Sequence, residues 1–180
     1  MYRFTGAHVV NLASQRELKV PLHHKDEFFS LRKWTELFYE SFHELFSRRI
    51  SQGRVRDCHG DLHMEHICLT PDLPIFDCIE FNERFRYSDT IADIAFLLMD
   101  LEYHGGHREA EHLWNHYKAL ANEDGEHIDA LVTFYKVYRA VVRGKVNSFR
   151  VDDTTMERED KEKAVETARR YFRLAYSYIA

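Results

Sequence analysis

The apolar residues between about Asp26 and Ser51 recur at steps of three and four positions. They are Leu31, Trp34, Phe38, Phe42, Leu45 and Phe46. This spacing places them on one face of a long amphipathic helix, and Gly53 follows its end. Residues 1–24 show no such period, and we expect them to form an N-terminal arm or the remnant of a linker.

After this helix the chain changes to short apolar pieces. Residues 67–69 and 73–79 flank Thr70-Pro71-Asp72, which is a turn sequence, so we predict a small β-hairpin. Beyond a charged loop at 80–88 the helical period returns and predicts helices at about 89–103, 107–122, 127–149 and 156–179. The expected fold class is therefore α+β and mainly α, with a long helix, a central loop, the hairpin and a helical C-terminal tail.

The composition is that of a soluble globular protein, because 44% of the 180 residues are hydrophobic and 31% are charged. One domain is the default at this length. A net charge of −5 offers no electrostatic case for nucleic acid or an anionic membrane, so we expect neither as a partner. The apolar run Ile94–Met99 is far too short to span a bilayer, and no signal peptide is evident.

The three cysteines, Cys58, Cys68 and Cys78, form no C-x-x-C pair and no even-numbered disulfide framework. Each has apolar neighbours in a stretch that resembles a strand. We therefore interpret them as small, buried hydrophobic residues in a reducing compartment, and we expect a cytoplasmic protein.

The candidate chemistry begins in the run Cys58-His59-Gly60-Asp61-Leu62-His63-Met64-Glu65-His66. The turn at His59-Gly60 would let the Asp61 carboxylate project from a loop with buried neighbours. A free Asp has a pKa of about 3.9, so Asp61 would position a hydroxyl nucleophile and would be a poor base for an alcohol. The alternative is a turn Asp that binds its own backbone.

A second carboxylate, Asp77, ends the apolar run at 73–76. A charge there is costly unless it is paired or bound to a metal, and Mg²⁺ that bridges nucleotide phosphates is a natural partner. The alternative is the end of a surface strand. His66 is a second metal-ligand candidate, and its imidazole suits ions softer than Mg²⁺. Alternatively, His66 orients Asp61 or is a structural histidine.

Three further groups of residues complete the candidate site. We expect His59 to support the loop backbone from inside, and His63 to be either loop scaffold or a substrate-facing residue. Asp93 lies on one helix face with two other carboxylates and needs donors if it is buried, so we expect it to anchor the loop backbone. Arg139 and Arg143 share a face and could hold an anionic substrate, although a solvated face is the commoner explanation.

The combination His59-Gly60-Asp61-Leu62-His63, then Phe76-Asp77, then Ser88-Asp89 and Asp93-Ile94-Ala95 resembles the C-terminal lobe of the aminoglycoside phosphotransferase (APH) family. It is most similar to bacterial APH-like proteins, some of which are fused to a P-loop ATPase domain. Tyr138-Arg139-Ala140 fits that subgroup too. The resemblance covers about residue 26 to the C-terminus, and we expect a kinase-like C-lobe at 25–180.

The resemblance implies a fold, a reaction and roles for residues. In kinase-type phosphoryl transfer an Asp orients the hydroxyl, and an Asn and a second Asp hold the metal. Asp61 would be the catalytic Asp, with His59 and His63 beside it, and Asp77 the metal ligand. Asp93 would be the helix anchor. The candidate substrate contacts are Glu80, Arg139 and Arg143.

The sequence departs from the family pattern at two points. His66 stands where the family has its metal-binding Asn, so that ligand does not carry over. The family also needs an N-terminal lobe (N-lobe) that covers the nucleotide phosphates, and this chain has neither a G-x-G-x-x-G run nor a G-x-x-x-x-G-K-S/T run.

The expected function is transfer of the γ-phosphoryl of ATP, or of another nucleoside triphosphate, to a hydroxyl of a small molecule. Mg²⁺ or Mn²⁺ would be the cofactor, and an N-lobe would be required. The alternative is a non-catalytic pseudokinase-type module that binds a partner, either a second copy of the chain or a separate N-lobe or ATPase domain. A metal-dependent hydrolase that uses His59, Asp61, His63, His66 and Asp77 is a third hypothesis.

Overall fold

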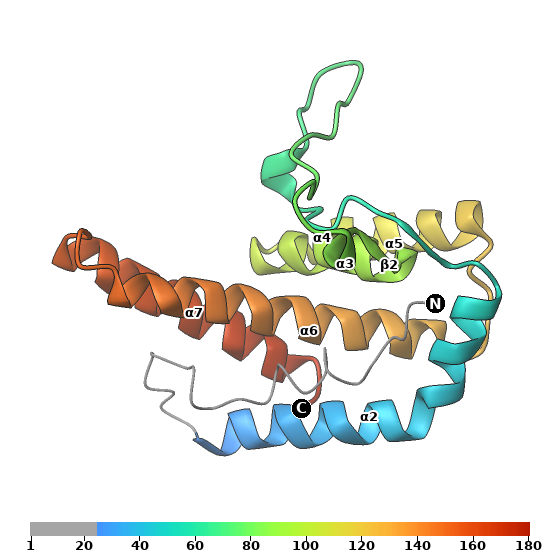
Figure 1. Cartoon of the computed structure of the whole chain (residues 1–180), viewed down its shortest axis with the longest axis horizontal. Coiled ribbons are helices and arrows are strands. Elements are labelled where there is room, and N and C mark those ends of the chain that lie inside the picture. Colours follow the sequence, from blue (N-terminus) through green and yellow to red (C-terminus); the bar gives the residue numbers. More distant parts are fainter. Residues whose placement is uncertain (1–24) are drawn as a thin grey trace. The chain divides into compact units, whose positions relative to one another are not determined.

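The computed structural model describes residues 25–180, and the predicted N-terminal arm at 1–24 lies outside the described residues. The chain divides into two compact units. One unit is Glu44–Lys136. The other consists of the residues up to His43 together with Val137–Ala180. Helices make up most of the described residues (Figure 1), which confirms a mainly α protein with a small amount of β structure.

The unit that combines both ends of the chain is helical. Its elements are parts of α2 (Lys25–Ser51) and α6 (Ile128–Phe149), with η3 (Arg150–Asp152) and α7 (Arg158–Ser177). The predicted apolar face of α2 is buried here at Leu31 and Phe38. Phe42 has non-helical dihedral angles, φ −119° and ψ 21°, so α2 bends there, which the uniform apolar period did not reveal.

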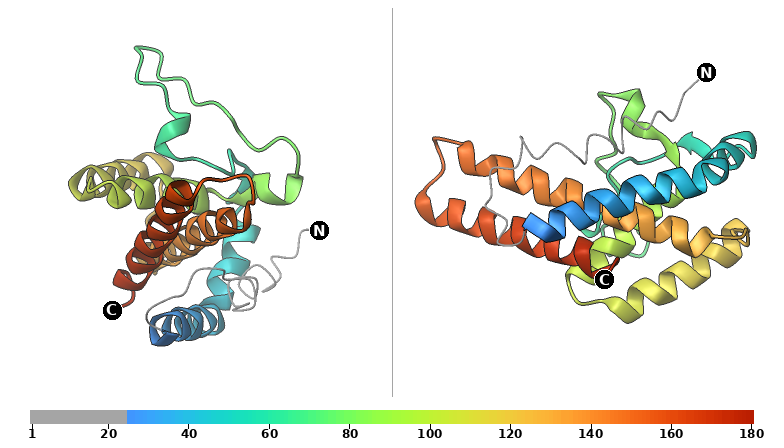
Figure 2. Two further views of the ribbon diagram at one scale, coloured as in Figure 1. Left: turned by 90° about the vertical axis from the view of Figure 1, so that its left-hand side faces the viewer. Right: turned by 90° about the horizontal axis from the view of Figure 1, so that it is seen from below.

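The second half of α6 and helix α7 lie side by side in this unit (Figures 1 and 2). Gly144 of α6 permits the close approach, because a Cβ at this position would meet Cζ of Phe172 at 2.9 Å. The side of α7 that faces inward is formed by small and aromatic residues, all buried: Ala164, Ala168, Tyr171, Phe172 and Ala175. The C-terminal tail therefore packs by the helical period that its sequence predicts.

The other unit contains the one two-stranded sheet found among the described residues. Strands β1 (Val55–Asp57) and β2 (Tyr87–Asp89) pair antiparallel, with Val55 opposite Asp89. A short helix, α3 (Glu83–Arg86), precedes β2. The sequence pattern predicts a loop at 80–88 instead, because two strands of three mostly polar residues have no alternating pattern to recognise.

Helix α4 (Thr90–Tyr103) is the centre of this unit. Every residue from Ile91 to Asp100 is buried, and α5 (His107–Ala121) packs against it. The predicted helices after residue 88 are confirmed, with ends within two residues of those expected. Among the described residues, no helix combines the length and apolar character that crossing a membrane would require.

The predicted β-hairpin is present only as a short ladder. Ile67 and Ile75 form a single antiparallel bridge, and the Cys68 amide donates to the Pro74 carbonyl at 3.0 Å. Beyond the 3₁₀ turn η2 (Met64–His66), this segment extends away from α4 (Figures 1 and 2). Its side chains from residue 68 to residue 78 are all exposed.

This exposure corrects the interpretation of the cysteines. Cys68 and Cys78 are exposed, so the prediction that they are buried is wrong for both. Their apolar neighbours do not bury these two cysteines, because the whole segment at 68–78 lies outside the core. Cys58, which directly follows β1, is half-buried, and burial raises the pKa of its thiol above the ordinary value.

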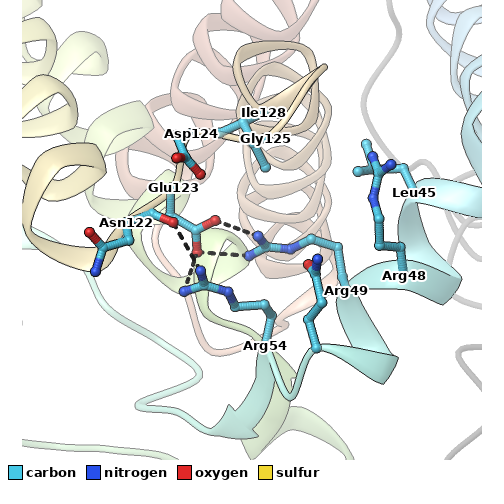
Figure 3. A pocket seen from close by; sticks show the side chains of 10 residues that line it. Leu45, Arg48, Arg49, Arg54, Asn122, Glu123, Asp124, Gly125 and Ile128 are labelled. Carbon is cyan, nitrogen blue, oxygen red and sulfur yellow. Dashed lines mark hydrogen bonds and ion pairs between the residues drawn. The ribbon is translucent and has the colours of Figure 1, made fainter.

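A buried ion-pair network ties the end of α2 to the rest of the same unit. The Arg49 guanidinium donates to both carboxylate oxygens of Asp89, at 2.6 and 2.8 Å, and also to Glu123. Figure 3 shows the guanidinium groups of Arg49 and Arg54 directed at Glu123, at the wall of a small pocket. The Asp89 side chain also caps α4 by accepting from the Ile91 amide.

We expect Arg49→Met to lower the free energy of unfolding by about 3–5 kcal/mol, because it leaves the Asp89 and Glu123 carboxylates buried without their cation. Urea titration followed by circular dichroism measures the loss. Arg48→Met, at the exposed neighbouring position, is the control and should change stability by less than about 0.5 kcal/mol. Equal effects of the two substitutions would contradict this role of the network.

Candidate functional site

The loop between β1 and η2 is held by carboxylates of α4. Asp93 accepts hydrogen bonds from two successive backbone amides, His59 N–H at 2.9 Å and Gly60 N–H at 3.0 Å. Further along α4, Asp100 accepts a hydrogen bond from the Met64 amide at 3.0 Å. The loop backbone is thus the donor that the sequence analysis expected for a buried Asp93.

Gly60 makes the turn that presents the Asp61 side chain. Its φ is +83°, a left-handed conformation that residues with a side chain adopt at a cost. A Cβ would also meet the Phe85 carbonyl oxygen at 3.0 Å and Ile79 Cδ1 at 3.1 Å. The Asp61 side chain that follows is 38% exposed, so its carboxylate is open to solvent. The backbone before it is held by the hydrogen bonds to Asp93.

His59 joins this loop to the segment that carries Asp77. Its Nε2 lies 2.7 Å from the Phe76 carbonyl oxygen, so Nε2 carries the proton and donates. Its Nδ1 then accepts from the Asp61 amide at 3.4 Å. The Ile79 amide donates to the His59 carbonyl at 3.0 Å. His59 therefore supports the backbone from inside, in agreement with the expectation from its place in the loop.

His66 lies between the two candidate carboxylates. Its Nδ1 is 2.9 Å from the Asp61 carbonyl oxygen, and its Nε2 is 3.3 Å from Oδ2 of Asp77. The side chains of His66 and Asp77 thus meet across the start of the hairpin segment, which is exposed from residue 68 to residue 78. Asp61 and His66 thus form one cluster, and Asp77 contacts this cluster through His66.

His63 is a buried member of the same cluster. It is 3% exposed, and its ring lies 4.0 Å from that of His66 and 5.5 Å from that of Phe96, centroid to centroid. Its Nε2 is 3.6 Å from Oδ2 of Asp61. This burial favours the loop-scaffold role over the substrate-facing one.

The interpretation of Asp77 as a charge in an apolar, buried place is wrong. The apolar run that ends at Asp77 predicts a costly charge, yet the Asp77 side chain is 75% exposed. The run before it, Leu73 to Phe76, is exposed with it, so no burial penalty acts on the carboxylate. Asp77 has a φ of +60°, a left-handed conformation that costs about 1 kcal/mol or more for a residue with a side chain.

The cluster has the donor set of a metal site. Among the described residues, Asp61, His63 and His66 each offer a ligand atom within 4.8 Å of the other two. His59, which the hydrolase hypothesis included, directs its Nε2 to the Phe76 carbonyl and is outside this set. Imidazole and carboxylate ligands together suit divalent ions of the first transition series.

The three candidate substrate residues do not belong to one compact unit. Glu80 is exposed beyond Asp77 on the same segment. Arg139 and Arg143 belong to the other compact unit, where the Arg143 guanidinium lies 5.7 Å from the Tyr171 ring centroid. Their role as substrate contacts stays a prediction. Asp100, which accepts from the Met64 amide, is a further anchor that the sequence-based predictions lack. Its position on one helix face with Asp93 could have indicated this role.

Comparison with known proteins finds distant relatives. Proteins described as uncharacterized, one from Mycobacterium bovis and two from strains of Mycobacterium tuberculosis, are 35% identical to this chain over 135 residues. The match covers 71% of this chain and 27% of each relative, so the chain spans about a quarter of their length. No family model and no solved structure matches the chain.

We expect Asp93→Ala to free the loop, because the His59 and Gly60 amides lose their acceptor. Unfolding free energy should fall by about 2–3 kcal/mol, and these two amides should exchange with solvent faster. Urea titration and hydrogen exchange by NMR measure both. The exposed turn variant Asp72→Ala is the control and should change neither. Unchanged exchange at His59 and Gly60 in Asp93→Ala would show that the loop is held by other contacts.

Proposed function

We propose that this chain is the catalytic lobe of an APH-like phosphotransferase, which transfers the γ-phosphoryl of ATP or another nucleoside triphosphate to a hydroxyl of a small molecule. The supporting observation is the linked pair of carboxylates. Asp61 stands on a loop that Asp93 anchors, and His66 connects its backbone to the exposed Asp77. The resemblance of the motifs to the APH family gives each carboxylate its role.

In this proposal Asp61 acts by position. Its partly exposed carboxylate would accept a hydrogen bond from the substrate hydroxyl and orient that oxygen towards the γ-phosphorus. The oxygen–phosphorus bond forms as the bond to the nucleoside diphosphate breaks, and the hydroxyl proton passes to Asp61 or to solvent. The buried anchors beneath the loop keep the carboxylate in place, which is the condition for positioning to contribute to the rate.

Asp77, with His66, would hold a divalent ion that bridges the nucleotide phosphates and neutralises their charge. Its exposure supports this role, since an ion that contacts both protein and nucleotide needs ligands open to solvent. His59 fixes the distance between the loop and the Asp77 segment through the Phe76 carbonyl. An N-lobe, supplied by a longer polypeptide or a partner, would cover the phosphates from the other side.

Titration calorimetry with ATP tests the proposal, with Mg²⁺ or Mn²⁺ present, on the 180-residue chain and on a longer polypeptide that joins it to an N-lobe. We expect weak nucleotide binding to the chain, at least about tenfold weaker in Asp77→Asn because an ion ligand is lost. Asp72→Asn, on the same exposed segment, is the matched control and should bind as the unmodified chain does.

Phosphoryl transfer should appear only when an N-lobe is present, and Asp61→Asn should slow it by at least about 100-fold. No heat from nucleotide or metal, with both the chain and the longer polypeptide, would exclude the proposal.

A second candidate function has its own supporting observation. The segment around the hairpin exposes large apolar side chains, with Leu69 at 89% and Phe81 at 84%. Contiguous exposed apolar surface commonly marks an interaction site. A non-catalytic binding module that self-associates through this segment would explain why these side chains are exposed.

Light scattering over a range of concentrations tests self-association. We expect a dimer that Leu69→Asp and Phe81→Asp dissociate, because each places a charge in the apolar contact. Leu120→Asp, at an equally exposed apolar position on α5, is the control and should leave the dimer intact. A strictly monomeric profile would exclude this version of the binding module.

A further inference from the structure

Two histidines on the exposed surface of α5 take no part in the site described above. His112 and His116 are both exposed, and they lie four positions apart, so they share one face of the helix. Their ring centroids are 4.2 Å apart, and the planes of the two rings are tilted by 45°. Histidines at this spacing on a helix can bind one metal ion together, because their rings approach the ion from successive turns.

The hydrogen bond of His116 leaves its second ring nitrogen available to an ion. Its Nδ1 lies 3.0 Å from the His112 carbonyl oxygen. A carbonyl oxygen only accepts, so Nδ1 carries the proton and, in the neutral ring, Nε2 bears a lone pair. Histidines that bind metals commonly donate their other N–H to a backbone carbonyl, which fixes the tautomer and orients the ring. The helix backbone thus holds His116 in the tautomer that a ligand at Nε2 needs.

The ring of His112 is the second ligand. Within the part of the chain that the structure describes, neither of its nitrogens has a hydrogen bond or an ion pair, so binding an ion breaks no such contact. With metal–nitrogen bonds of about 2.0–2.1 Å, the centroids of two imidazole ligands lie about 4.5 Å apart when the bonds are at right angles, and about 5 Å apart in a tetrahedral arrangement. The observed 4.2 Å is closer to the first value, so small rotations of these exposed rings suffice.

We propose that His112 and His116 form a chelating site on α5 for a divalent ion of the late transition metals. Bonds at right angles are typical of Cu²⁺ and Ni²⁺ with nitrogen ligands, and Cu²⁺ binds such ligands more tightly than Ni²⁺ or Zn²⁺. Water completes the coordination, because both residues are exposed. Mg²⁺ prefers oxygen ligands and is not retained. This site shares no residue with the loop cluster, and the inference does not rest on the proposed function.

A copper titration followed by NMR tests the site residue by residue, because bound Cu²⁺ broadens the signals of nearby amides and spares distant ones. Amide proton–nitrogen spectra of the 180-residue chain are recorded as Cu²⁺ is added up to an excess over all candidate sites. We expect the amides around His112 and His116 to broaden beyond detection, together with or without those of the loop at 59–66. A large excess of Mg²⁺ should neither cause nor prevent this broadening.

Substitution of each histidine tests whether the two rings act as one chelate. His112→Asn and His116→Asn each change an exposed side chain, so the chain stays folded, and circular dichroism checks this. A chelate that loses one arm also loses the high effective concentration of the other. Each variant should therefore need at least about tenfold more Cu²⁺ to broaden the α5 amides to the same extent.

His107→Asn is the matched control on the same helix. His107 is exposed and lies five positions before His112, so it is off the face that the pair shares. This variant should need the same Cu²⁺ concentration as the unmodified chain. The site would be overturned by α5 amides that keep their intensity in excess Cu²⁺, by unchanged broadening in both variants of the pair, or by its loss in His107→Asn.

The stability of the chain in Ni²⁺ gives a second, independent measurement. An ion that both rings bind only while α5 is folded raises the free energy of unfolding. Excess Ni²⁺ should therefore raise the urea midpoint of the unmodified chain and of His107→Asn by the same amount, and that of His112→Asn by less. An equal rise in all three, or no rise in the unmodified chain, would contradict a chelate on this helix.

Discussion

The carboxylates of α4 are the constraint on which the candidate site depends. This helix is buried from Ile91 to Asp100, so a charge on it has no solvent and must find donors inside the protein. Asp93 and Asp100 take theirs from the backbone amides of the loop, and Asp89 takes its from Arg49. Because leaving any of these charges without a partner would be costly, the loop is held in one position.

That position determines the geometry around Asp61. With the amides of His59 and Gly60 directed into the core, the next carboxylate faces outward. His59 then reaches the Phe76 carbonyl, and His66 reaches Asp77. An exposed and otherwise irregular segment thereby places Asp77 beside His66, which also contacts the Asp61 carbonyl. The anchors of the candidate site are thus buried beneath the loop, and the carboxylates of Asp61 and Asp77 lie at the surface.

His66 gives this site a chemistry of its own. An Asn at this place would contribute an amide oxygen, which suits Mg²⁺, whereas the imidazole contributes a nitrogen and also binds the Asp61 backbone. The imidazole therefore links the Asp61 backbone to Asp77 and offers a nitrogen ligand, which suits transition-metal ions better than Mg²⁺.

Much of this molecule follows from the sequence alone. The helical period located every long helix of the described residues to within about two positions, because periods of this kind arise from each helix burying one face. The spacing of Asp61, Asp77 and Asp93 identified the candidate site, and the need of a buried Asp for donors predicted what Asp93 binds. For the helices local rules suffice, because a residue's neighbours in sequence are also its partners.

Tertiary structure alone decided the rest, because the partners are far apart in the chain. Nothing local pairs Arg49 with Glu123, 74 positions away, or brings Val55 opposite Asp89. Apolar neighbours suggested buried cysteines and a buried Asp77, but burial depends on whether the segment meets another surface, and this one extends into solvent. The contact of His66 with Asp77 likewise required the folded loop, since the loop backbone sets which ring nitrogen faces Asp77.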